Sequence, residues 1–288
     1  MKVWDLANGR EVATYRGHLD QPDDPTRGPN GTDGTNILRV AAVAFHPRDP
    51  KIIASASGNQ VHLWNPEDGK AGKTLVNLGK NDKPIKAIAF SPDAKSLAVG
   101  ADDGILRVYE VETGKATYTS PSRNARIETL AYSPNGKMIV VGDSNTFAAV
   151  YAPGTPNPLA MTAQVVNAGE VMGVAFGADN SSVFSCGRDG SARLTAGPKP
   201  DGTTAGNTST KLRDYSGHTG AVTCLAVVPD GSLLVTGGED KTVRIWEVTS
   251  GKQLRAFQGH LGKVSAVAAR GDGTQVASAS EDGAIRVW

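Results

Sequence analysis

A short apolar segment returns six times along the chain. The copies are hexamers that begin with a β-branched residue and carry small or apolar residues behind it: VAAVAF (40–45), IKAIAF (85–90), IETLAY (127–132), VMGVAF (171–176), VTCLAV (222–227) and VSAVAA (264–269). Segments with apolar residues on both faces are typical of inner strands that lie buried between neighbouring sheets. The sequence therefore predicts six equivalent buried strands, each of which we call strand a.

Further strands follow each strand a. A Pro-Asn-Gly or Pro-Asp-Gly turn, as at 134–136 and 229–231, leads into a small, apolar strand b, and a second tight turn leads into strand c. A fourth, more polar strand d comes next, as at 253–257. Strand c closes on an aromatic residue in most units: Trp4, Trp64, Tyr109, Tyr151, Trp246 and Trp288. A repeated four-strand unit favours an all-β propeller over a sandwich or barrel.

The spacing of these units supports the propeller. Most strand c ends lie about 42 to 45 residues apart, which is the length of a propeller blade repeat. Two longer intervals contain insertions of loop composition, at 19–36 and 196–210. We expect a single β-propeller domain over 1–288, with repeats ending near 4, 64, 109, 151, 195, 246 and 288. That is six complete four-stranded repeats plus the end of another, in a six- or seven-bladed parent.

Two arrangements of the first strands stay open. The strand d at 11–15 either pairs with the last unit and closes six blades, or it belongs with residues 1–4 to the remainder of a seventh blade. The chain starts inside a strand c and stops before any further strand d. The sequence-based expectation is therefore a fragment of a longer chain.

At this point the sequence resembles the WD-repeat β-propeller family over essentially its whole length. The motif elements are Gly-His pairs at 17–18, 217–218 and 259–260, together with the closing Trp residues, of which only Trp4 is followed by Asp. The resemblance implies structural hydrogen-bonded tetrads of His, Ser or Thr, Asp and Trp. The two tetrads expected on this basis are His218, Thr236, Asp240 and Trp246, and His260, Ser278, Asp282 and Trp288.

The same residue types invite a catalytic interpretation, which the repetition disfavours. Two parallel copies, one with Thr in place of Ser, indicate a repeated fastening, whereas a nucleophile would be unique. GxSxG, HExxH, Walker-loop and paired CxxC motifs are absent from the sequence. We therefore predict no catalytic residue, no metal site and no cofactor, and we predict that the chain is not an enzyme.

The other repeats carry incomplete tetrads. The first has His18, Ser55 and Trp64 but offers Asn59 in place of Asp, and the second has Asp103 with Tyr109. The third is expected to use Asn145 with Tyr151, and the fourth to use Ser185 and Asp189 with Thr195.

Charge and targeting signals narrow the classes of partner. The chain has 30 Lys and Arg residues against 29 Asp and Glu residues, so no global field favours nucleic acid or an acidic membrane. The first residues lack an apolar signal region, and no stretch has the length of a membrane helix. We expect a cytoplasmic protein without a membrane or nucleic-acid partner. The two cysteines, Cys186 and Cys224, lie in strand-like segments and are expected to be buried and unreactive.

Propellers of this family usually bind partners on the face formed by the d–a and b–c loops. The expected rim combines residues just before strand a with residues just before the Asp of the b–c turn. Its members have mixed charge and include arginine, which is enriched at interface hot spots. They are Arg39, Asp102, Arg126, Glu170, Arg188, Glu239, Lys263 and Glu281.

The resemblance and this rim predict a non-catalytic scaffold that binds partner peptides or protein surfaces on the top rim. We expect a monomeric propeller that works within a complex of other proteins. Two alternatives remain: a regulatory propeller domain of a larger multidomain enzyme, and a metal-dependent propeller hydrolase. A channel metal would need several inward His, Asp, Asn or Glu ligands at one depth, and the strand a hexamers offer few.

Overall fold

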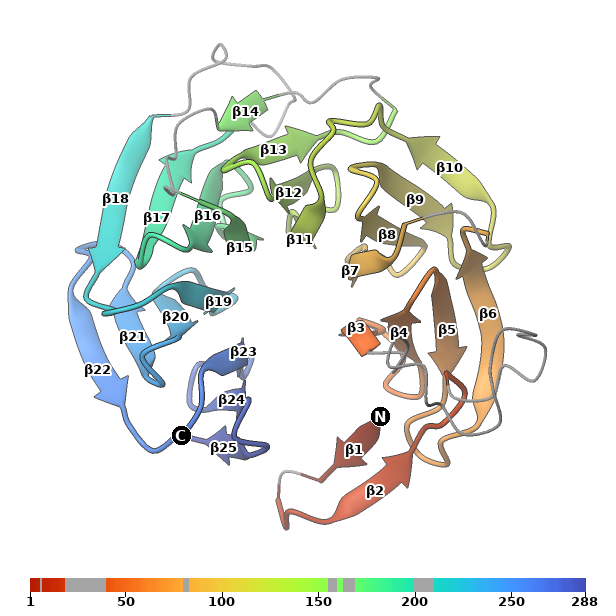
Figure 1. The fold of residues 1–288 in the computed structure, drawn as a ribbon, viewed down its shortest axis with the longest axis horizontal. Coiled ribbons are helices and arrows are strands. Elements are labelled where there is room, and N and C mark those ends of the chain that lie inside the picture. The colour runs from red at the N-terminus through yellow and green to blue at the C-terminus, as the bar shows by residue number, and fades with distance from the viewer. Residues whose placement is uncertain (6, 19–39, 80–82, 155–159, 163–168, 199–209) are drawn as a thin grey trace, which may run out of the picture.

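The protein is an all-β ring of small antiparallel sheets. The computed structural model describes residues 1–5, 7–18, 40–79, 83–154, 160–162, 169–198 and 210–288. These residues form strands, turns and loops, without a helix among them. The sheets are arranged around a common centre (Figure 1), so the predicted propeller is confirmed.

Six blades are built on the six strands a. The six hexamers of the sequence and the six innermost strands have identical bounds. Five blades have four strands each. The first consists of β3 (Val40–Phe45), β4 (Ile53–Ser57), β5 (Gln60–Trp64) and β6 (Ala71–Asn77), and the second of β7 (Ile85–Phe90), β8 (Ser96–Ala101), β9 (Leu106–Glu110) and β10 (Ala116–Thr119). The third consists of β11 (Ile127–Tyr132), β12 (Ile139–Asp143), β13 (Ala148–Tyr151) and β14 (Ala160–Thr162), the fourth of β15 (Val171–Phe176), β16 (Ser182–Gly187), β17 (Ser191–Ala196) and β18 (Lys211–Ser216), and the fifth of β19 (Val222–Val227), β20 (Leu233–Gly238), β21 (Val243–Glu247) and β22 (Gln253–Phe257). The sixth blade has three strands, β23 (Val264–Ala269), β24 (Val276–Ser280) and β25 (Ile285–Val287).

A sequence repeat consists of strands d, a, b and c, whereas a blade consists of strands a, b, c and d, so repeats and blades are offset by one strand. Strand d of each repeat is the outer strand of the preceding blade, as β6 pairs with β5 and β10 pairs with β9. The six complete repeats therefore run from β2 (Glu11–Thr14) to β25, and β1 (Lys2–Trp4) is the strand c of another. β1 and β2 form a two-stranded sheet of their own, in which Lys2 lies opposite Thr14. The alternative in which the first strand d pairs with the last unit is thus wrong.

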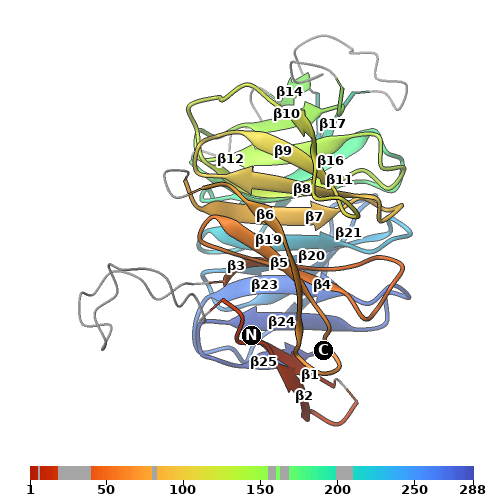
Figure 2. The same ribbon diagram turned by 90° about the vertical axis from the view of Figure 1, so that its right-hand side faces the viewer.

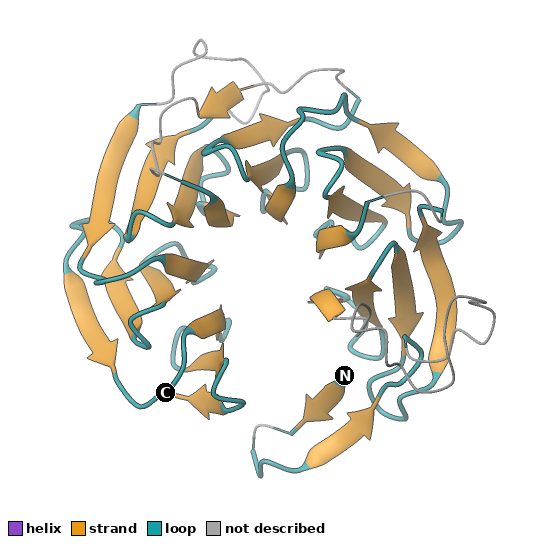
Figure 3. Cartoon of the chain, in the orientation of Figure 1, coloured by secondary structure: helices purple, strands orange, loops and turns teal. Residues whose placement is uncertain are grey.

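Strands a lie nearest the centre and strands d lie at the periphery, as Figures 1 and 3 show. The strands a of successive blades contact one another from β3 to β23. In the side view of Figure 2 the strands of neighbouring blades are stacked closely on one another. Among the described residues, this arrangement brings the d–a and b–c loops to one end of the blades and the a–b and c–d turns to the other, because the strands of each meander alternate in direction.

The hydrophobic core lies between blades. One cluster joins Ala56 and Leu63 of the first four-stranded blade to Ile88 and Phe90 of the next, and a second joins Val108 to Tyr151 in the same way. Each strand a therefore buries its apolar side chains against the preceding blade, as expected for repeats that cannot form a core alone.

Strand β3 departs from this rule. Val43 and Phe45 are 56% and 63% exposed, whereas their counterparts Ile88 and Phe90 are 7% and 9% exposed. The small β1–β2 sheet instead packs against β4 and β5 of this blade, where Tyr15, the residue after β2, stacks on Trp64 with ring centroids 4.8 Å apart.

A β-bulge is present near the start of every strand a. In each pairing of strands a and b the register shifts between the first and third residues of strand a, as between Ile127 and Thr129. A bulge re-aims the extra side chain. The second residue of each hexamer, for example Lys86 or Glu128, occupies this extra position.

Candidate functional site

Both predicted tetrads are present. In the repeat that ends at β21, His218 Nδ1 lies 2.9 Å from Asp240 Oδ1, and His218 Nε2 lies 2.8 Å from Thr236 Oγ1. Trp246 Nε1 donates to the same Thr236 oxygen at 2.8 Å. The buried hydroxyl of Thr236 thereby joins strand b to strand c and to His218 of the loop before strand a, and His218 in turn binds the b–c turn.

The last repeat reproduces this geometry with serine. His260 is 3.0 Å from Asp282 Oδ2 and 2.8 Å from Ser278 Oγ, which also accepts a hydrogen bond from Trp288 Nε1 at 2.9 Å. The backbone N–H of Leu261 donates to Asp282 at 2.8 Å. These backbone and histidine hydrogen bonds hold the pKa of Asp282 well below its usual range.

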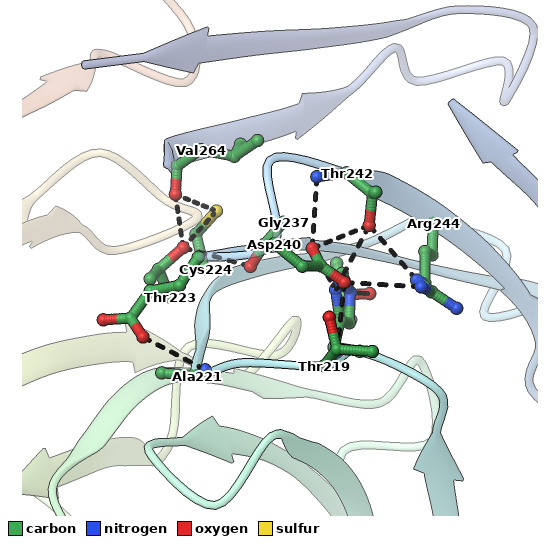
Figure 4. A network of polar contacts seen from close by, with 12 residues as sticks. Thr219, Ala221, Thr223, Cys224, Gly237, Asp240, Thr242, Arg244 and Val264 are labelled. Carbon is green, nitrogen blue, oxygen red and sulfur yellow. Dashed lines mark hydrogen bonds and ion pairs between the residues drawn. The ribbon is translucent and has the colours of Figure 1, made fainter. Parts of the chain in front are cut away.

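The electrostatics of the first tetrad favour an ionised Asp and a neutral His. Burial opposes the charge on Asp240, but hydrogen bonds from His218 and Thr242 outweigh it and lower the pKa of Asp240 to about 2. Burial lowers the pKa of His218, although Asp240 acts in the opposite direction. Figure 4 shows Asp240 at the centre of this network, with Thr242 and Arg244 beside it. A neutral His that donates to Asp leaves its other nitrogen to accept from Thr236.

The first repeat is fastened differently from the prediction. His18 Nε2 lies 2.7 Å from Ser55 Oγ, which Trp64 Nε1 also approaches at 3.2 Å, as expected. Asn59 does not replace the Asp, because its side chain donates to the Gly79 carbonyl. His62 takes the place instead: its ring stacks on His18 with centroids 4.3 Å apart.

Tyr15 completes this site from outside the predicted set, since its hydroxyl lies 2.7 Å from His62 Nδ1. Burial, and then the nearby His62, lower the pKa of His18 to about 4.

The third repeat also differs. Asn145 contributes only its backbone N–H, which donates to Asp143 Oδ1 at 2.9 Å. Asp143, at the end of β12, is 2% exposed and pairs with Arg123 of the loop before strand a at 3.3 Å. An Arg–Asp pair here joins the same two loops that His and Asp join elsewhere.

The second and fourth repeats rely on a turn Asp and an Arg of strand c. Asp103 pairs with Arg107 at 2.6 Å, and Asp189 pairs with Arg193 at 2.5 Å. Thr195 donates to the Val183 carbonyl at 3.2 Å. Ser185 has no hydrogen-bond partner among the described residues, so the expected link to Asp189 is not formed.

The two predicted sets of rim residues lie next to each other within each of five blades. In these five blades, the backbone N–H of the first residue after strand b donates to the carbonyl of the residue before strand a. The pairs are Asp102 with Pro84 (3.0 Å), Ser144 with Arg126 (3.0 Å), Arg188 with Glu170 (3.4 Å), Glu239 with Ala221 (2.9 Å) and Glu281 with Lys263 (3.0 Å). Arg39 and the insertion at 19–36 lie outside the described residues.

Side chains reinforce these backbone pairs. Lys263 lies 2.8 Å from Glu281, and Glu239 accepts a hydrogen bond from the backbone of Ala221 at 3.3 Å. Asp102 is 3.8 Å from Lys86, which occupies the bulge of β7. The bulge residue is the part of this rim that the sequence analysis missed.

Arg126, Glu128, Glu170 and Arg188 form the longest ionic chain of the described rim. Glu170 accepts from Arg126 Nη2 at 3.0 Å and from Arg188 Nε at 3.1 Å, and Arg126 Nε donates to Glu128 at 3.0 Å. Arg126 precedes β11 and Glu170 precedes β15, so this chain crosses from one blade to the next.

Other classes of site receive no support from the described residues. They contain no grouping of three or more His, Cys, Asp or Glu side chains suited to a metal ion. They also contain no helix with the length and apolar character needed to cross a membrane. Burial raises the pKa of Cys224 to about 12 and that of Cys186 well above its usual value, so both thiols stay protonated at neutral pH.

Comparisons with known proteins agree with this architecture. The family described as WD domain, G-beta repeat matches residues 162–195, 209–247 and 251–288, and the family described as anaphase-promoting complex subunit 4 WD40 domain matches residues 71–125. The chain is 22% identical over 219 residues to Protein hir1 of Emericella nidulans, a match that covers 74% of this chain and 18% of that protein.

Two animal proteins are similarly related. The identity is 24% over 229 residues to the human angio-associated migratory cell protein, covering 78% of this chain and 50% of that protein. It is 22% over 231 residues to the serine-threonine kinase receptor-associated protein of Gallus gallus, covering 70% of this chain and 65% of that protein. The chain thus spans half or less of the length of the hir1 and angio-associated relatives. The repeat period, the sheet order, the two complete tetrads and these matches together show that the chain belongs to the WD40-repeat β-propeller family.

Proposed function

We propose that this chain is a non-catalytic scaffold that binds peptides or protein surfaces on the rim at the d–a and b–c end of its blades. The observation that carries the proposal is the ionic chain from Arg126 through Glu170 to Arg188. It sets charged side chains from two neighbouring blades at one place on the loop end of the ring. Loops held by a rigid scaffold are the usual location of binding residues.

The state of the catalytic-looking side chains supports a binding role over an enzymatic one. Thr236 is fully buried and Ser278 is 2% exposed. Each hydroxyl is already shared between a histidine and a tryptophan. A nucleophile must reach its substrate, and these hydroxyls face other side chains of the same blade.

A pair of charge-reversed variants tests the proposal. One variant carries Arg126→Glu and Lys263→Glu on the rim. The matched control carries Lys115→Glu and Lys252→Glu, in c–d turns at the opposite end of the blades. Affinity capture with quantitative mass spectrometry should show partners that the wild type and the control retain and the rim variant loses. Equal recovery of partners by both variants would remove the rim as the binding face.

Two further expectations belong to this proposal. Size-exclusion chromatography of the purified chain should give the volume of a monomer, since the proposed partners are other proteins. The cytoplasmic location stays a prediction, which cell fractionation of the tagged chain would test.

A further inference from the structure

Arg126 and Arg188 differ from the other rim cations because they share a single carboxylate. Glu170 binds Arg126 through Oε1 and Arg188 through Oε2, so one side chain fixes both guanidinium groups. The other two cations of the described rim are lysines, and each faces a carboxylate of its own blade: Lys86 faces Asp102, and Lys263 faces Glu281. One carboxylate, that of Glu170, therefore fixes the positions of two exposed cations from neighbouring blades.

Both guanidinium groups have donors to spare. Each carries five N–H groups in a planar fork. Arg188 uses one of them for Glu170, and Arg126 uses two, for Glu170 and Glu128, among the described residues. The two side chains are 61% and 53% exposed, while that of Glu170 is 17% exposed. The shared carboxylate is thus covered, and the remaining N–H groups are open to solvent.

The second carboxylate of the chain, Glu128, is also much less exposed than the guanidinium group that it binds. Glu128 occupies the bulge of β11, and its side chain is only 19% exposed. Burial and the neighbouring Glu170 raise the pKa of Glu128, against the opposing influence of Arg126 and Lys86. Both carboxylates are thus largely covered, and the exposed part of the cluster consists of the remaining guanidinium N–H groups.

We propose that Arg126 and Arg188 together form a receptor for one carboxylate side chain, an Asp or Glu of a partner peptide bound on the rim. This inference rests on the proposed scaffold function and names the chemistry of its partner. Arginine pairs bind carboxylates through short, charge-assisted hydrogen bonds, and Glu170 holds both forks in place before the partner arrives. A single negative charge suits the site better than a phosphate dianion, which would be repelled more strongly by Glu170 and Glu128 beneath it.

The test begins with peptides selected on the wild-type chain from a phage-displayed library of random linear sequences. Selected peptides are synthesised, and their dissociation constants are measured by fluorescence anisotropy with the wild type and with two variants. The first variant, Arg126→Gln with Arg188→Gln, removes the proposed receptor. The second, Lys115→Gln with Lys252→Gln, removes two exposed cations from c–d turns at the opposite end of the blades and serves as the matched control.

We expect the selected peptides to share an Asp or Glu. Its replacement by Asn or Gln should raise the dissociation constant for the wild type about tenfold or more. The same replacement should have little effect with the Arg126→Gln, Arg188→Gln variant, because the receptor is already absent. The control variant should bind like the wild type. The two arginines are more than half exposed, so their replacement should leave the melting temperature nearly unchanged.

Three results would overturn the inference. Selected peptides without a required acidic residue, or acidic peptides that bind the Arg126→Gln, Arg188→Gln variant as tightly as the wild type, would exclude the receptor and leave rim binding itself intact. Tighter binding of peptides with phosphoserine at the acidic position would assign the arginines to phosphate. Peptides that bind the charge-reversed rim variant unchanged would contradict the scaffold proposal, and the receptor with it.

Discussion

The hydroxyl of Thr236 joins two strands and a loop, and its removal should have a large effect. The substitution Thr236→Val keeps the shape of the side chain and deletes the oxygen. Thr236 Oγ1 lies 2.8 Å from both His218 Nε2 and Trp246 Nε1. Thr236 is fully buried and Trp246 is 2% exposed.

The expected loss follows from the two partners left behind. A buried polar group that loses its hydrogen-bond partner costs roughly 1–3 kcal/mol. Two such groups, the imidazole nitrogen and the indole N–H, give a loss of about 2–6 kcal/mol in the free energy of unfolding. Thr195→Val is the matched control. Thr195, in the strand c of another blade, is fully buried like Thr236, but its hydroxyl makes a single hydrogen bond, to the Val183 carbonyl at 3.2 Å. Its loss should be about 1 kcal/mol.

Urea unfolding followed by far-ultraviolet circular dichroism measures both losses, and hydrogen exchange with mass spectrometry locates them. Exchange in Thr236→Val should rise first in β20 and β21, because stability varies along a repeat structure. Equal losses in the two variants would refute the reasoning, since the tetrad would then contribute no more than one ordinary hydrogen bond.

Three more predictions concern other parts of the ring. His18 has a folded-state pKa of about 4 against an ordinary value of 6.5, so neutral His18 stabilises the fold fully above about pH 6.5. This contribution to the free energy of unfolding, on the order of 3 kcal/mol, is lost as the pH falls toward 4. Urea titrations at pH 7 and pH 4.5 should therefore show a smaller decrease of the free energy of unfolding at acid pH in His18→Gln than in the wild type. Phe90→Ala should lower the free energy of unfolding by about 3 kcal/mol or more, and Phe45→Ala by less than about 1 kcal/mol, because only the first substitution creates a buried cavity. A lower melting temperature for Phe45→Ala than for Phe90→Ala would contradict the packing described for β3. Asp143→Asn should lower the free energy of unfolding by about 2 kcal/mol through loss of the ion pair with Arg123. Asn145→Ala should change it by less than about 0.5 kcal/mol, because only the backbone N–H of Asn145 is used. Chemical denaturation measures both changes, and equal losses would show that the side chain of Asn145 contributes as much as that of Asp143.

The strands a were predictable to the residue because their signal is local. A hexamer such as that of β7 is apolar on both faces, which only an inner strand between two blades satisfies. The complete tetrads were predictable because the resemblance to the WD-repeat family implies them, and a Gly-His pair, a hydroxyl, an Asp and a Trp occupy the required positions in two repeats. In both cases the feature repeats, so each copy supports the other.

The substitutes for the missing tetrads were not predictable, because each occurs once. His62 lies opposite Ser55 at the position where Arg244 lies opposite Thr236, and nothing in the sequence indicates that its ring stacks on His18. Asp143 ends strand b and appears to be an ordinary turn residue until Arg123 is known to reach it. Such pairs depend on the path of a loop, which propensity and periodicity do not determine.

The rim shows how a repeated fold and a variable sequence divide the work of recognition. The backbone hydrogen bonds before each strand a recur in five blades whatever the side chains are, so the fold fixes where rim residues stand. The side chains at those fixed positions differ from blade to blade: Lys263 faces Glu281, Glu170 faces Arg188, and Pro84 leaves Asp102 to a lysine in the bulge. Since geometry is shared and charge is not, we expect partner choice to follow the order of charges around the rim. Exchanging the charges of Glu170 and Arg188 should therefore keep the fold and its stability while changing which peptides are selected, because the replaced pair preserves the local salt bridge but moves its negative end away from Arg126.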